Sequence, residues 1–311
     1  MPPTSPHFAS PAWGRPFVLA ALAAAACLSS LPAQADVLAR IKSGEPLRLA
    51  HRESSVPFSY VLPGAAAGAP PVGYAVDICL QLAEAVRKAT GMAKMPVQWL
   101  LVTPANRIDM IAQGKADLEC GSTTNNAERR QRVDFTVPHL IVGARLLVKA
   151  GNEVDQLRDL RGKTVVSTRG TTPMKVLQQN NREHMLGLNI VEAPDHEQAV
   201  KMVEAGQAEA FVMDDVLLVG LASGRADPKA LKVTGRLLTT EPLAVMLPKD
   251  DTAFKTVIDA EMKRLVRDGD IYKLYDRWFL SPIPPNGRAL ELPLNYLTKD
   301  FWKYPTDKVP F

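Results

Sequence analysis

The sequence lacks three features that would assign it to large functional classes. No basic run is long enough to indicate nucleic-acid binding, because the net charge of +4 is spread along the chain. No pair of His, Cys or acidic residues shows the spacing of metal ligands, so neither a metal nor a cofactor is expected. Beyond residue 35, no apolar run is long enough to cross a membrane. The composition, 46% hydrophobic and 23% charged, is that of a globular protein with room for two modest cores.

The N-terminus has the pattern of a secretory signal. An apolar run from Phe17 to Leu31 precedes Ala33-Gln34-Ala35, which is an A-x-A cleavage site. We therefore expect residues 1–35 to be a cleaved signal peptide and the mature chain to start near Asp36. A transmembrane anchor is the alternative, but the run has about 15 residues and spanning needs roughly 20. Cys27, which directly follows Ala-Ala-Ala, also permits a lipoprotein signal, although the A-x-A site is better placed.

Removal of the signal leaves two cysteines, Cys79 and Cys120, in an exported and oxidising setting. Cys79 lies on the apolar stripe of a helix expected over Tyr74–Thr90, facing the core where the strand that carries Cys120 should lie. A disulfide closing a loop of about 40 residues would stabilise the fold by roughly 4 kcal/mol. Two separately buried thiols are the alternative, and the disulfide is favoured.

The stretch Asp117–Thr136 organises the candidate site. A short alternating run ends at Gly121 and opens onto small hydroxyl and amide residues, among them Ser122 and Thr124. Arg129 follows about one helical turn later. A guanidinium binds a carboxylate with a two-pronged fork, so this loop suits the carboxylate of a small amphoteric ligand. The alternative is a solvated connection before a charged helix.

Two further arginines lie where α/β folds place ligands. Arg52 directly follows the strand expected over Leu47–Ala50, among hydroxyl and aromatic residues. Arg107 falls in the first turn of a helix expected over Arg107–Gln113, where the helix dipole disfavours a cation. A ligand carboxylate would explain both positions, and so would ion pairs with neighbouring acids such as Glu53.

The second half of the chain adds neutral and acidic candidates. Thr172 followed by Pro173 is a helix-start pattern, with Thr172 as the N-cap, and the N–H groups of that turn can bind an anion. His196 begins another helix after the capping residue Asp195. Asp214, at the end of an apolar strand, suits a ligand ammonium. The alternatives are caps that serve only their own helices and a histidine at the surface.

The order of elements predicts two α/β lobes. Apolar strands at Leu140–Lys149 and Leu243–Pro248 fall outside the β/α alternation and are the expected crossings between lobes. A chain that leaves a lobe and returns to it makes a two-strand hinge, with the ligand in the cleft. The predicted parts are 36–143 as the first part of lobe 1, 144–243 as lobe 2, and 244–311 as the return helices of lobe 1 and the C-terminal tail.

Seven stretches of the sequence carry a resemblance to a known family: HRESSVPFSY (51–60), VGYAVD (72–77), ECGSTTNNAERR (119–130), GTT (170–172), DH (195–196), FVMDD (211–215) and DRWFLSPIPP (276–285). From about Leu47 to Pro285 the chain resembles the periplasmic solute-binding proteins of polar amino acid ABC transporters (family 3), specifically the glutamate/aspartate-binding branch. The resemblance implies a type II two-lobed fold and a monomer in the periplasm. It also implies a non-catalytic role, in which the lobes close on one amino acid that is delivered to a membrane permease.

The resemblance also implies a role for each candidate residue. His196 should bind best when protonated, with a neighbouring carboxylate favouring that form. One position departs from the branch: Pro104 replaces a serine, which removes one or two hydrogen bonds to the ligand side chain at roughly 1 kcal/mol each. The implied partners are Arg129, Thr124 and Thr172 for the α-carboxylate, Ser122 and Asp214 for the ammonium, and Arg52, Arg107 and His196 for a side-chain carboxylate.

Three functions remain in competition. A glutamate- or aspartate-binding protein explains the ligand chemistry most fully, and the departure at Pro104 leaves another amino acid or a small dicarboxylate open. A dehydratase-type enzyme on the same fold needs a poised acid or base, for which only Glu53 and Glu119 are nearby. A sensor or adaptor would need a transmembrane or signalling segment after the lobes, and the sequence shows none there.

Overall fold

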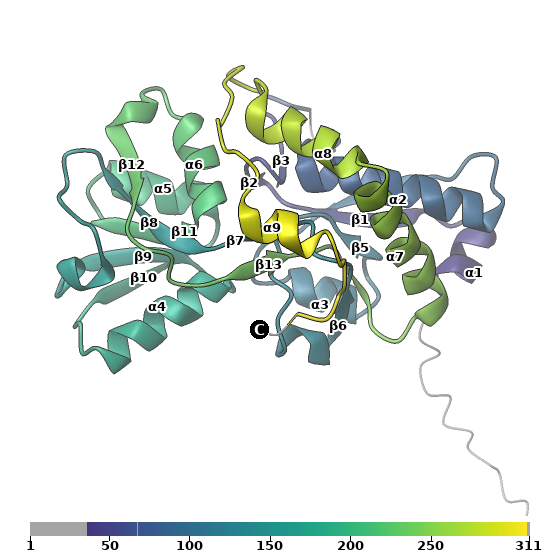
Figure 1. The fold of residues 1–311 in the computed structure, drawn as a ribbon, viewed down its shortest axis with the longest axis horizontal. Helices are drawn as coiled ribbons and strands as arrows, with labels where there is room; N and C mark the ends of the chain where they lie inside the picture. The colour runs from purple at the N-terminus through teal and green to yellow at the C-terminus, as the bar shows by residue number, and fades with distance from the viewer. Residues whose placement is uncertain (1–35, 67, 310–311) are drawn as a thin grey trace, which may run out of the picture. The chain divides into compact units, whose positions relative to one another are not determined.

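The computed structural model describes residues 36–66 and 68–309, which form two α/β lobes (Figure 1). The segment predicted to be a signal peptide lies outside the described residues. Among the residues described, no helix has both the length and the apolar character needed to cross a membrane. The same residues contain no group of three or more His, Cys, Asp or Glu side chains placed to hold a metal ion.

The first lobe is built on a five-stranded sheet in the order β4-β1-β5-β14-β6. β1 (Leu47–His51) pairs in parallel with β4 (Val97–Leu101) and with β5 (Leu118–Glu119). β14 (Met246–Pro248) lies antiparallel between β5 and β6 (Val133–Phe135). Because β14 follows the whole second lobe in sequence, the chain leaves the first lobe and returns to it.

The second lobe has its own sheet in the order β10-β9-β11-β8-β12. β9 (Thr164–Thr168) pairs in parallel with β10 (Asn189–Ala193) and β11 (Ala210–Asp214). β8 (Ala144–Lys149) is antiparallel to β11 and to β12 (Leu231–Thr234), a strand without a counterpart in the sequence prediction. The carboxyl ends of β9 and β11 share one edge of the sheet, where open α/β sheets place ligands.

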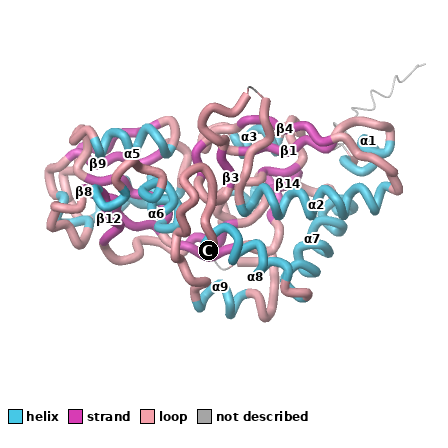
Figure 2. The backbone as a smooth tube through the Cα atoms, turned by 90° about the horizontal axis from the view of Figure 1, so that it is seen from above, coloured by secondary structure: helices cyan, strands magenta, loops and turns pink. Residues whose placement is uncertain are grey.

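The main helix of the first lobe is α2 (Tyr74–Thr90), which has the range predicted from its apolar stripe. It packs on α7 (Thr252–Arg267), beside which it lies in both views (Figure 1, Figure 2). The helix predicted over Asp270–Leu280 divides into α8 and a π-helical segment. The remaining helical segments of this lobe are α1 (Val37–Lys42), α3 (Arg107–Ala112), α8 (Asp270–Tyr275) and the π segment Asp276–Leu280.

Three helices follow the strands of the second sheet: α4 (Thr172–Glu183), α5 (His196–Glu204) and α6 (Asp215–Ser223). The start of α4 corrects the prediction that Thr172 is the N-cap. Thr171 is the N-cap, since its hydroxyl accepts a hydrogen bond from Met174 N at 3.3 Å. Adjacent threonines offer the same capping chemistry, so the sequence alone does not decide which of the two is the N-cap. The shift releases the Thr172 hydroxyl for other contacts.

Each of the two crossings between the lobes contains two strands, where the sequence predicted one continuous strand. The first run divides at Gly143 into β7 (Leu140–Val142) and β8. The second predicted strand, Leu243–Pro248, covers β14 and only the last residue of β13 (Glu241–Leu243). β7 and β13 pair antiparallel and form the two-strand hinge. A continuous apolar run shows that a segment is buried but not in which sheet, and for that reason the prediction missed both breaks.

The C-terminal tail packs on the hinge. Thr298, in α9 (Tyr296–Phe301), accepts a hydrogen bond from Ile141 N at 2.9 Å. Asn295 donates from its side-chain amide to Ile141 O at 2.7 Å. The outward edge of β7 is therefore satisfied by the tail instead of by a third strand. No sequence pattern predicted this contact.

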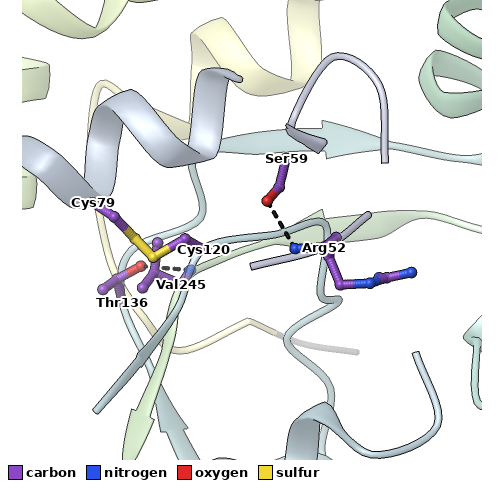
Figure 3. The surroundings of a disulfide bond; sticks show 6 residues. All are labelled: Arg52, Ser59, Cys79, Cys120, Thr136 and Val245. Carbon is purple, nitrogen blue, oxygen red and sulfur yellow. Dashed lines mark hydrogen bonds between the residues drawn. A yellow bond between two sulfur atoms is a disulfide. The ribbon is translucent and has the colours of Figure 1, made fainter. Parts of the chain in front are cut away.

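A disulfide joins α2 to the strand end that opens the candidate site (Figure 3). Cys79 and Cys120 are bonded with a Cα–Cα distance of 6.0 Å, which confirms the predicted pairing. Figure 3 also shows Arg52, whose backbone N–H donates to the Ser59 hydroxyl at 3.0 Å, holding the exit of β1. The crosslink anchors the segment immediately before Ser122.

Candidate ligand-binding site

A small polar cavity lies where the two lobes meet, at the ends of β5 and β11 and at the first residues of α3, α4 and α5. Its volume is ≈ 10 Å³. Six of the residues predicted from the sequence line it, and the other two, Arg52 and Arg129, contact residues of the lining. The six are Arg107, Ser122, Thr124, Thr172, His196 and Asp214.

All three candidate arginines come from the first lobe and are buried: Arg52 is 1% exposed, Arg107 2% and Arg129 6%. Arg129 belongs to a 3₁₀ turn (Arg129–Gln131) and donates to Thr124 O at 2.9 Å and to Gly170 O of the second lobe at 3.4 Å. Arg52 Nη1 and Arg107 Nε have no hydrogen-bond partner among the described residues. A buried cation with free donors is costly unless an anion completes its contacts, so these groups point to an anionic ligand.

Burial lowers the pKa values of all three arginines. Burial, with the nearby charge of Arg107, lowers the pKa of Arg52 to about 9 and that of Arg129 to about 10. Both guanidinium groups therefore remain charged at neutral pH. Glu119 and, for Arg129, also Glu241 and Asp214 act in the opposite direction. The cluster is an interleaved set of buried cations and anions.

Three buried carboxylates accompany the arginines. Glu119 and Glu241 are 0% exposed and Asp214 is 1% exposed. Burial raises the pKa of Asp214 well above its usual range, and the charges of Glu241 and Asp215 add to that shift. Among the described residues, Asp214 Oδ1 and both carboxylate oxygens of Glu119 have no hydrogen-bond partner. A ligand ammonium beside Asp214 would restore its ionised form.

The environment of His196 corrects the expectation that this side chain is protonated. Its Nε2 lies 3.4 Å from Arg52 Nη2, and its Nδ1 lies 2.9 Å from the Thr168 hydroxyl. Burial, together with the charges of Arg52 and Arg107, lowers the pKa of His196 well below its usual value. Because a guanidinium can only donate, Nε2 is the acceptor and the ring is neutral. Sequence proximity to Asp195 suggested a carboxylate partner, but Asp195 caps α5 through Gln198 N instead.

The lobes touch beside the cavity. Thr172 Oγ1 of the second lobe lies 3.4 Å from Thr124 Oγ1 of the first. Gly170 lies against Pro104, and a Cβ at that glycine would be 2.7 Å from Pro104 O. Lys175 and Glu128 form an exposed ion pair at 2.5 Å across the same junction. The structure is therefore that of lobes in contact around the cavity.

Residues 47–281 match the family model of bacterial extracellular solute-binding proteins, family 3. The chain belongs to this family.

Curated relatives of this solute-binding protein are similar over nearly their full length. It is 40% identical over 294 residues to the L-glutamate/L-aspartate-binding protein of Pseudomonas aeruginosa, covering 93% of this chain and 96% of that one. It is 36% identical over 277 residues to a glutamate/aspartate import solute-binding protein of Salmonella typhimurium, covering 89% and 90%.

Solved structures establish the fold of the solute-binding protein. An ancestral arginine-binding protein bound to arginine superposes with a TM-score of 0.67 at 22% identity, covering 75% of this chain and 98% of that one. A solute receptor for L-cysteine of Neisseria gonorrhoeae gives a TM-score of 0.67 at 22% identity, covering 78% and 93%. These proteins share the two-lobed, type II α/β architecture predicted from the sequence.

Sequence reasoning missed the role of two carboxylates in this solute-binding protein. The sequence presents Glu119 as a possible acid or base of an enzyme, yet this residue lies between Leu118 and Cys120 in a buried strand. A carboxylate in such a run is itself a signal, because acids are almost never buried without a partner. Glu241 gives no local signal, since it reaches the site only through the pairing of the hinge strands.

Proposed function

We propose that this solute-binding protein binds glutamate or aspartate and delivers it to an ABC transporter permease. The observation that carries the proposal is the combination of three buried arginines with the buried carboxylate of Asp214 at one cavity. Two carboxylates and one ammonium match that set of charges. The names of the curated relatives, which bind or import glutamate and aspartate, support the same ligands.

The amino acid head group is assigned to residues on both sides of the cavity. Arg129 provides the fork for the α-carboxylate, with the backbone of Thr172 in the first turn of α4 and the backbone of Thr124 beside it. Asp214 and Ser122 receive the ammonium.

The side-chain carboxylate is assigned to Arg52 and Arg107, whose free donors are described above. His196 contributes as a neutral ring that orients Arg52 through the 3.4 Å contact. Pro104 has neither a hydroxyl nor an N–H to add, so these two arginines carry most of the discrimination between acidic and neutral ligands.

Binding requires the lobes to move. A cavity of ≈ 10 Å³ is far smaller than an amino acid, so the ligand enters when the walls separate and is enclosed when they meet. The moving bodies are the predicted parts 36–143 with 244–311, and 144–243, joined by β7 and β13. The protein is a binding protein and not an enzyme, and we propose that it acts as a monomer in the periplasm.

Calorimetric titration of the purified mature protein tests the ligand assignment. The panel is glutamate, aspartate, glutamine, asparagine and small dicarboxylates, and we expect glutamate or aspartate to bind tightest. Preferential binding of glutamine or of a cationic amino acid would overturn the assignment of Arg52 and Arg107 to a carboxylate.

A further inference from the structure

Glu241 is a buried carboxylate on the hinge that no ligand role yet explains. It is the first residue of β13, is 0% exposed, and pairs by backbone with Val142 of β7. Its Oε2 accepts a hydrogen bond of 2.6 Å from the Thr124 hydroxyl, and its Oε1 has no partner among the described residues. A short bond to a buried carboxylate is of the strong, charge-assisted kind.

The loop that carries Thr124 is fastened to the same hinge strand. Asn125 N donates to Pro242 O at 2.8 Å, and Ala244 N donates to Thr123 O at 3.0 Å. These two backbone bonds flank Thr124, which also forms an isolated bridge with Leu243. The distance between Thr124 and Glu241 is therefore set by backbone pairing and not by two flexible side chains.

The contact decides what Thr124 can offer a ligand. A hydroxyl has one hydrogen to donate and two lone pairs with which to accept. The hydrogen goes to Glu241, and one lone pair accepts from Thr172 Oγ1 at 3.4 Å. The remaining lone pair can accept from an ammonium, whereas it cannot bind a carboxylate. This reverses the role predicted for the Thr124 side chain, although its backbone can still serve the α-carboxylate.

We propose that Glu241 is a positioning residue that holds the Thr124 hydrogen away from the cavity and thereby selects ligands with an ammonium group over plain dicarboxylates. The inference rests on the proposed function and adds a specificity device to it. The influence of Glu241 on Asp214 places a second negative charge near the same ammonium position. Burial lowers the pKa values of Arg107 and Arg129, and the charge of Glu241 acts on both in the opposite direction. Glu241 therefore opposes an anion that brings no cation.

Matched ligand pairs provide the test. Glutarate is glutamate without the amine, and succinate is aspartate without it. Glu241→Gln keeps the shape of the side chain but removes its charge and its fixed acceptor. In calorimetry we expect this variant to bind glutamate about tenfold more weakly. Its affinity for glutarate should stay unchanged or rise a few-fold, because a charge that opposes anions is gone.

Thr124→Val is the companion variant. It should produce the same selective loss for glutamate, and the double variant should lose no more than either single variant, because both remove one interaction. Asp214→Asn removes the proposed direct acceptor of the ligand ammonium. Its loss of discrimination between glutamate and glutarate is the largest that we expect, and the other variants are compared with it. Glu241→Asp keeps the charge but withdraws it from Thr124, and supplies a second route if the glutamine variant does not fold.

The possible outcomes distinguish a failure of this inference from a failure of the proposed function. Equal losses for glutamate and glutarate in the Glu241 variants, or additive effects with Thr124→Val, would show a structural role only and overturn this inference. If the unaltered protein bound neither glutamate nor aspartate, the proposed function itself would be wrong and the inference would fall with it.

Discussion

The two walls of the cavity differ in charge. The first lobe supplies all three arginines together with Glu119, whereas the second lobe supplies hydroxyls, the neutral ring of His196 and the single carboxylate of Asp214. The first lobe is also crosslinked next to its ligand loop by the disulfide at Cys120. In the proposed function, the first lobe therefore binds the anionic groups of the ligand and the second lobe encloses them with neutral donors.

The largest expected effect comes from removing Arg129 from the first-lobe wall of the cavity. Arg129→Ala should abolish measurable binding of every amino acid, because the α-carboxylate loses its fork. The loss of about 3–5 kcal/mol corresponds to more than ~100-fold in Kd. Thr172→Val in the opposite wall removes one hydrogen bond and should cost only about 1 kcal/mol. Calorimetry on both variants measures the two losses of affinity, and their ratio compares the two walls.

Arg132→Ala is the matched control for Arg129. It lies three residues further along the chain, is 52% exposed in its side chain and pairs with Asp109, so its loss should leave affinity unchanged. Similar losses for Arg129→Ala and Thr172→Val would contradict the division of labour between the walls.

The second prediction separates the head group from the side chain within the first lobe. Arg52→Ala should weaken glutamate and aspartate by about 2–3 kcal/mol while sparing glutamine, because only the acidic ligands bring a carboxylate to that position. The measurement is the ratio of glutamate to glutamine affinity in the variant and the unaltered protein. An unchanged ratio would remove Arg52 from the proposed site.

The third prediction concerns the meeting of the walls. A Cβ at Gly170 would lie 2.7 Å from Pro104 O, so Gly170→Ala should hold the lobes apart and weaken all ligands by about 1–3 kcal/mol. Small-angle scattering should show a larger radius of gyration with saturating ligand than for the unaltered protein.

Gly162→Ala is the matched control for the closure prediction. Gly162 lies in the same lobe with a similar φ of +71°, compared with +77° at Gly170, but a Cβ there would meet nothing within 4 Å. Both alanines strain the backbone equally, and only one blocks closure. If both variants weaken binding alike, backbone strain and not contact between the lobes is the cause.

The features that could be predicted from the sequence are those that local sequence patterns indicate. Arg52, Arg107 and Asp214 could be proposed for the site because each directly follows or begins an element whose ends can be located from local patterns. The disulfide, which the structure confirms, could be predicted because the expected signal peptide takes one cysteine and leaves only two. These inferences needed no knowledge of how distant segments pair.

What the sequence did not show depends on long-range pairing. Glu241 meets Thr124 across 117 residues of separation, through the hinge strand β13, of which the predicted strand Leu243–Pro248 included only the last residue. The charge state of His196 depends on Arg52, which lies 144 residues away. Local sequence shows a histidine beside an aspartate, but the packing of the lobes decides which neighbour touches the ring.

The smallest expected effect uses one buried histidine from each lobe. Burial lowers the pKa of His139 in the first lobe to about 3, and burial with Arg52 and Arg107 lowers that of His196 in the second lobe. In the unfolded chain both rings gain a proton below about pH 6.5, while the folded chain leaves them neutral. Stability is therefore fully present above that pH and falls as the pH is lowered from there towards the folded values. Each histidine contributes up to about 1.4 kcal/mol per pH unit.

His196→Gln should remove one of these two contributions in the ligand-free protein. Urea unfolding at pH 6.5, 5.5 and 4.5 should show a slope that is smaller by about 1.4 kcal/mol per pH unit than in the unaltered protein. Asp214, with its raised pKa, acts with the opposite sign in both proteins and cancels in the difference. His184→Gln removes an exposed imidazole and is the control for the substitution itself. An unchanged slope in His196→Gln would mean that His196 is protonated in the folded state, and that the second wall also carries positive charge.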